Sequence, residues 1–225
     1  MSLRTVFPPR DVAELMRMRT RAQERARLPS GLSPGWHSDL VDPVQVIEAF
    51  DLWLRDDVHA RTHHHVSTEG VRGVVWVCSG RLDPSVEPPP WSGREDPPRP
   101  ANWVEPMEAV GFAPGAWSFL CASVLVRELD ELGHTGAFAR WSKRELCDGS
   151  LPVPVGIDFW DADPPADLRP EVIEDSIGTT VRFHTFRRDP LVVYRHEDRF
   201  TEDDLAASSR ERIVGRAQRE GSDRS

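Results

Sequence analysis

The sequence of 225 residues is poor in lysine, asparagine and tyrosine, each of which occurs once, as Lys143, Asn102 and Tyr194. Codons for these residues are AT-rich, whereas the abundant arginine, alanine, glycine, proline and tryptophan have GC-rich codons. The bias therefore indicates a GC-rich genome, and we expect a bacterial origin. The single lysine precedes an expected edge strand at 151–160, which argues against nucleases that pair clustered carboxylates with a lysine on the adjoining strand.

Cysteine is scarce as well, with three residues in the chain. An odd number without C-x-x-C spacing excludes a disulfide framework and favours free thiols in a reducing compartment. The first residues also lack the apolar run of a signal peptide, so we expect a cytoplasmic protein. The three thiols belong to Cys78, Cys121 and Cys147.

A hydrophobic run long enough to cross a bilayer is also missing. Residues 109–126 carry no charge, but a proline and two glycines interrupt them and leave only 116–126 as a continuous helical run. A transmembrane helix needs about 20 residues. The stretch therefore predicts a central buried helix in the core, which we place at 116–132 with Gly133 as its end.

Nucleotide-binding and hydrolase signatures are absent too. Neither G-x-G-x-x-G nor G-x-x-x-x-G-K-[ST] occurs, which excludes a standard dinucleotide fingerprint and a P-loop. Residues 31–35 match G-x-S-x-G, but they follow an expected helix and place Pro34 directly after Ser33. A nucleophile elbow instead joins a strand to a helix. The sequence thus contains no recognisable catalytic motif.

The composition predicts a folded protein, since 39% of residues are apolar and the chain has eight tryptophans and nine phenylalanines. Its formal net charge of −9 opposes non-specific attraction to nucleic acid or to an anionic membrane. Neither is therefore an expected partner, and the oligomeric state is not determined by the sequence.

Three segments are expected along the chain. Residues 1–30 form a basic helical arm, 31–200 a single α+β globular domain, and 201–225 a polar C-terminal helix and tail. We assign α+β because helices and antiparallel-looking strands occur without regular βαβ alternation. The domain is expected to hold an antiparallel or mixed sheet packed on the central helix.

The clearest local signals are a capped helix and a β-hairpin. Asp42 is a good N-cap before Pro43, and Gln45 completes a capping box. Residues 179–186 and 191–196 predict a hairpin. Pairing Phe186 with Leu191 places Val181, Phe183 and Thr185 on one face with Val192, Tyr194 and His196. The other face then carries Arg182, His184, Phe186, Val193 and Arg195.

Half of the eight histidines fall within 59–65. If the preceding helix continues, Asp56, His59 and His63 share a face. If the segment is instead a strand, His63 and His65 share one. Either arrangement offers two imidazoles to a divalent metal such as zinc, which needs further ligands. The alternative is a polar helix end or strand with neutral imidazoles.

The second candidate metal site is acidic and follows the expected edge strand, where Asp161 and Asp163 lie in the run 158–167. Carboxylates at a strand end bind hard cations such as Mg²⁺. Combined with Asp56, His59, His63 and His65, they would form the site of a metal-dependent enzyme, perhaps a hydrolase. A solvated acidic turn explains the same residues without a metal.

A proline-rich insertion at 83–106 carries Trp91 and Trp103. Proline holds extended conformations at low entropic cost, and tryptophan is a good contact anchor. Together with the lack of a catalytic motif, this favours a non-catalytic protein that binds another protein. The basic arm supplies further candidate contacts in Arg17, Arg21 and Arg25, although a helix lying on its own acidic body explains them too.

Overall fold

The structure is a computed structural model that describes residues 2–80, 99–149, 159–160, 165, 167–201 and 205–216. The chain divides into two compact units, and the first boundary along the sequence falls within helix α1 (Pro9–Arg25). Unit 1 comprises residues 1–16, 143–202 and 207–225, and unit 2 comprises residues 17–142 and 203–206. No helix in the described part of the chain combines the length and apolar character needed to cross a membrane.

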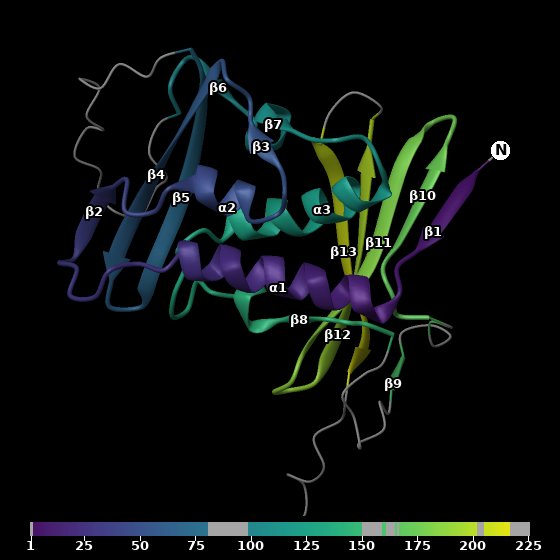
Figure 1. The fold of residues 1–225 in the computed structure, drawn as a ribbon. Helices are drawn as coiled ribbons and strands as arrows, with labels where there is room; N and C mark the ends of the chain where they lie inside the picture. Colours follow the sequence, from purple (N-terminus) through teal and green to yellow (C-terminus); the bar gives the residue numbers. More distant parts are fainter. Residues whose placement is uncertain are drawn as a thin grey trace, which may run out of the picture. The chain divides into compact units, whose positions relative to one another are not determined.

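Unit 1 is built on one seven-stranded sheet (Figure 1). The described strand pairs in it are antiparallel. In sheet order the strands are β1 (Leu3–Val6), β10 (Glu171–Asp175), β11 (Gly178–Arg187), β12 (Val192–Phe200), β13 (Ala207–Arg216) and β9 (Phe159–Trp160), and β8 (Glu145–Leu146) also pairs with β11.

The two faces of this sheet differ because side chains alternate along each strand. One face carries Val181, Phe183 and Thr185, each completely buried, which form part of the core. The opposite face is polar over much of its length. At one end, however, Phe186 and Val193 pack there in a small apolar cluster with Cys147, Leu168 and Val214.

The described part of unit 2 combines two small sheets with helices α2 (Pro43–Glu48) and α3 (Ala116–Asp130) and the second half of α1. Helix α2 begins at Asp42, whose carboxylate accepts a hydrogen bond from Val44 N, as its sequence predicts. Helix α3 contacts α2 and β5. The strands are β2 (Gly35–Ser38), β4 (Val58–Ser67), β5 (Gly70–Ser79) and β6 (Trp103–Val104) in one sheet, and β3 (Trp53–Leu54) with β7 (Val110–Gly111) in the other.

Two short 3-10 helices complete the described elements, at Pro106–Ala109 and Trp141–Lys143. The α+β class with antiparallel sheets is confirmed. A helix does lie within 116–132, with most of its side chains buried. Its place as the support of a sheet stays a prediction, as does the proline-rich insertion, most of which falls outside the described residues.

The hairpin is confirmed, with both faces as predicted. Phe186 pairs with Val193 rather than with Leu191, a shift of two residues that keeps every side chain on its face. The helix expected after residue 200 is wrong for 207–216, which form β13. Those residues pair with β12 along its whole length, and this long-range pairing outweighs the weak local preference of a segment rich in arginine and serine.

Candidate functional site

The polar face of the unit 1 sheet concentrates arginine side chains. Register places Arg182 opposite Glu171 and Glu197, Arg195 opposite Arg212, and Glu197 opposite Arg210. Residues directly opposite one another project from the same face. We call the resulting surface the arginine face, made up of Arg4, Glu171, Arg182, Arg195, Glu197, Arg199, Arg210 and Arg212.

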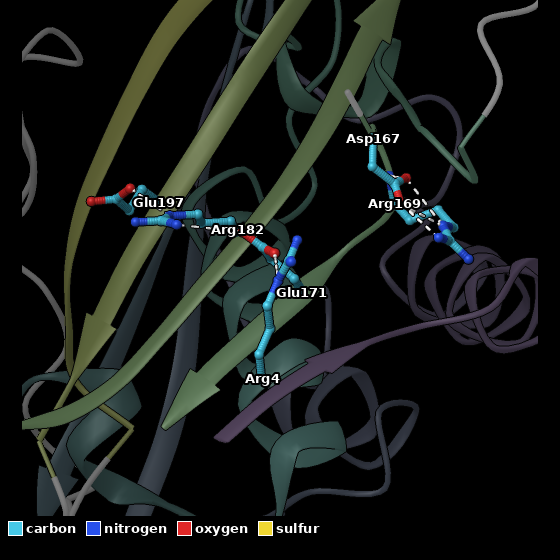
Figure 2. A network of polar contacts seen from close by, with 6 residues as sticks. All are labelled: Arg4, Asp167, Arg169, Glu171, Arg182 and Glu197. Atoms are coloured by element: carbon cyan, nitrogen blue, oxygen red, sulfur yellow. Dashed lines mark hydrogen bonds and ion pairs between the residues drawn. The ribbon is translucent and has the colours of Figure 1, made fainter. Parts of the chain in front are cut away.

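Two glutamates hold four of these arginines in a continuous network. Arg182 lies between them, with Nη1 3.4 Å from Glu171 and Nε 2.9 Å from Glu197 (Figure 2). Arg4 Nε is 2.6 Å from Glu171. Glu197 also pairs with Arg195 at 3.3 Å and with Arg199 at 3.2 Å. Four positive charges thus share two negative ones.

A neighbouring ion pair extends this charged region toward the loop before β10. Arg169 donates from Nε and Nη2 to the Asp167 carboxylate, at 2.6 Å for Nη2 (Figure 2). These two residues line a hollow of about 270 Å³ with Arg4, Glu171, Arg182, His184 and Arg195. The lining is therefore four arginines, two carboxylates and one imidazole, apart from Val6 and Pro165.

Two carboxylates of this region, Asp167 and Glu197, have pKa values below their ordinary ones. The hydrogen bond from Arg169 lowers the pKa of Asp167. Burial raises the pKa of Glu197, but hydrogen bonds and charges from Arg182, Arg199 and Arg195 outweigh burial and leave that pKa below its ordinary value. Asp167 and Glu197 are thus ionised at physiological pH.

His184 in this hollow is buried, with 6% of its surface exposed. Its Nδ1 is 3.3 Å from the Leu168 carbonyl, which can only accept, so Nδ1 carries the hydrogen. Burial lowers the pKa of His184 to about 4, so the ring is neutral at physiological pH. Nε2 therefore presents a lone pair, and it has no hydrogen-bond partner among the described residues.

No family model, curated protein or solved structure matches this chain. The arrangement of its own residues is therefore the basis for assigning a function.

The histidine cluster of the sequence forms part of β4 in unit 2, a strand and not the continuation of a helix. The helical alternative, in which Asp56, His59 and His63 share a face, is wrong for this segment. In a strand, residues four apart are separated by about 13 Å. His59 and His63 are therefore too far apart to share one metal, whereas His63 and His65 remain neighbours on one face.

The two central imidazoles of β4 are engaged in local contacts. His63 Nδ1 lies 3.0 Å from Ser38 Oγ, and its ring packs edge-on to Trp76 with centroids 4.2 Å apart. His64 donates from Nε2 to the Leu132 carbonyl at 3.2 Å. Burial lowers the pKa of both His63 and His64 to about 4, so both are neutral at physiological pH.

Within the described ranges, no group of three or more histidine, cysteine or acidic side chains is placed to hold a metal ion. Asp161 and Asp163 lie outside the described residues, so their approach to His63 or His65 stays a prediction, as does a zinc or magnesium site. Asp56 lies in the turn before β4. His59 is the second residue of β4 and is exposed.

The predicted partner-binding residues differ in their surroundings. Arg25 donates to the Gln45 carbonyl, and Arg17 and Arg21 also interact with other residues of the chain. Trp103 lies in β6, where the Arg99 guanidinium is 3.9 Å from its ring centroid. Trp91 lies outside the described residues. A role of these residues in binding a partner stays a prediction.

Only part of the arginine face can be predicted from the sequence. The predicted hairpin places Arg182, His184 and Arg195 on one face, and that much could be read from local alternation. Arg4, Arg210 and Arg212 were missed because pairing with β1 and β13 brings them there over long sequence distances.

Proposed function

We propose that this chain is a non-catalytic binding protein and that the arginine face of unit 1 binds an acidic segment of another protein. The observation that supports this is the charge of the face. Its six arginines outnumber the four carboxylates that register places on the same side of the sheet, Glu171, Glu197, Asp175 and Glu145, in a chain with a net charge of −9. Such a local excess attracts an acidic partner and steers its approach.

The exposure of the arginines suits this role. Side chains of Arg4 and Arg199 are 62% and 59% exposed, and those of Arg182 and Arg195 are about a third exposed. Arg210 and Arg212 on β13 are also exposed. The guanidinium is planar and forms two parallel hydrogen bonds to a carboxylate, so a row of arginines fits a row of acidic side chains.

An acidic protein segment fits better than nucleic acid. Sites for single-stranded nucleic acid combine positive charge with exposed aromatic rings for base stacking. Among the described side chains on this face, the aromatic ones are Phe186 and His184, and both are buried.

Fluorescence anisotropy with a labelled glutamate-rich peptide tests the proposal. Wild-type protein should bind the peptide, with affinity that falls as salt rises, and Arg210→Glu/Arg212→Glu should raise the Kd by about tenfold or more. The matched control is Arg55→Glu/Arg140→Glu, which changes the net charge equally with two exposed arginines of unit 2. Equal losses in the two variants would overturn the assignment to this face.

A further inference from the structure

The hollow beside Arg182 and Arg195 has features that a surface binding only acidic side chains does not need. We infer that it is a site for an oxyanion that carries a hydroxyl, with the hydrogen-phosphate group as the best-fitting chemistry. The inference rests on the proposed function, because the hollow is part of the same charged surface. It adds a specific ligand group to a general preference for negative charge.

The lining favours an anion by charge and supplies donors for it. Arg4, Arg169, Arg182 and Arg195 outnumber the two carboxylates, Asp167 and Glu171. Each guanidinium has five N–H donors. In the network Arg182 uses Nε and Nη1, and Arg195 uses Nη2, so further donors remain for a ligand.

Residues that accept hydrogen bonds also line this hollow, and a fully deprotonated anion cannot use their acceptors. His184 Nε2 has a lone pair and no partner among the described residues, and the side chain is more than nine-tenths buried. The charges that act on His184 are those of Arg195, Glu171 and Asp167, which line the hollow with it. A buried acceptor without a donor is costly, and a ligand hydroxyl would satisfy it.

The group that donates a hydrogen bond to His184 Nε2 should be a neutral hydroxyl and not an ammonium, because the lining has a net positive charge. Hydrogen phosphate offers both parts, since it keeps one hydroxyl at neutral pH beside its charged oxygens. Sulfate has the same shape but no hydroxyl at that pH. The hollow should therefore discriminate between two tetrahedral anions of similar size.

Size and access are compatible with this ligand. A volume of about 270 Å³ is roughly nine times the share of one water in the liquid, so a tetrahedral group fits with part of the molecule that carries it. Arg195 and Arg182 keep 27% and 32% of their side chains exposed. Partly exposed side chains change rotamer rapidly, which gives a ligand a route to the buried nitrogen.

Isothermal titration of wild-type protein with inorganic phosphate and with sulfate, at pH 7.5 and equal ionic strength, tests the inference. We expect phosphate to bind with a Kd at least about tenfold below that of sulfate. His184→Phe keeps a ring but removes the acceptor, and should abolish the preference. His184→Gln restores an acceptor and should recover it in part. Arg182→Gln/Arg195→Gln should weaken binding of both anions.

Equal Kd values for phosphate and sulfate in the wild-type protein, or binding of neither anion, would overturn the inference without any variant. Circular dichroism shows whether His184→Phe folds, and the partly exposed Arg182 and Arg195 provide the test if it does not. The glutamate-rich peptide separates the two proposals, because His184→Phe should leave its binding unchanged. Phosphate selectivity without peptide binding would refute the proposed function and keep this inference.

A phosphoserine peptide distinguishes the two sources of such a group. Its phosphate ester has a second pKa of about 6, so it gains the required hydroxyl as the pH falls toward that value. Tighter binding of this peptide than of free phosphate at pH 6 would assign the hollow to a modified side chain of a partner. Tighter binding of free phosphate would assign it to the ion itself.

Discussion

The histidines of β4 and the arginines of the arginine face are two groups of ionisable side chains that differ in burial, charge and contacts. His63 and His64 are buried, neutral and hydrogen-bonded to nearby atoms. The arginines are charged, partly or fully exposed, and exceed the carboxylates that hold them. The first group contributes to the core of unit 2, and the second is available to a ligand.

Residues that are close in the sequence and residues that are close in the fold indicate different sites in this protein. Four histidines within seven residues suggest a metal site, but strand geometry sends alternate side chains to opposite faces. Six arginines spread from position 4 to position 212 form no cluster in the sequence, but antiparallel pairing puts them on one surface.

Protonation of the β4 histidines and of carboxylates beside the arginine face should lower the free energy of unfolding in different pH ranges. This is the largest effect that we expect. The folded pKa of His64, about 4, lies below its unfolded value of 6.5, so between these values the unfolded state binds more protons. Stability should therefore fall as the pH drops from 6.5 to about 4, by at most about 3 kcal/mol for this residue. His63 and His184 act in the same direction.

Glu197 of the arginine face and Asp167 of the neighbouring ion pair should respond only at lower pH. The pKa values of Asp167 and Glu197 are depressed, so their contribution is present above their ordinary values of 3.8 and 4.5 and is lost below them. Urea unfolding from pH 7.5 to pH 3 measures both windows. A free energy of unfolding that is constant between pH 6.5 and 4.5 would contradict the buried, neutral state of the histidines.

A single methyl group at position 73 should damage the histidine strand. Gly73 lies against the Leu132 carbonyl and the His64 ring, and a Cβ there would collide with backbone that cannot move away cheaply. We expect Gly73→Ala to lower the free energy of unfolding by about 2–3 kcal/mol. Gly80→Ala is the control, because its Cβ meets open space and only its positive φ costs about 1 kcal/mol. Equal losses would show that the site near His64 is not tightly packed.

Sequence reasoning was strongest where the determining contacts are local. The Asp42 cap and the hairpin of β11 and β12 depend on residues within a few positions of one another, and both are confirmed. The strand at 207–216 depends on pairing with β12, and its local composition resembles a polar helix. The arginine face inherits that difficulty, because half of its arginines come from β1 and β13.

Substitutions on the arginine face should have the smallest effect on stability. Arg210 and Arg212 are exposed, and exposed surface substitutions usually change the free energy of unfolding by less than about 0.5 kcal/mol. Thermal unfolding of Arg210→Glu/Arg212→Glu should therefore match the wild-type protein. A large loss of stability would mean that these arginines support the fold, and the contrast with the histidine strand would no longer hold.

Mapping the bound peptide tests the central claim most directly. A glutamate-rich peptide with a photo-activated crosslinker should label the exposed strands of unit 1, within 178–216, and the labelling should decline as salt rises. Crosslinks concentrated at 17–25 or 83–106 would instead place the partner on the basic helix or the proline-rich insertion, and would contradict the arginine face as the binding surface.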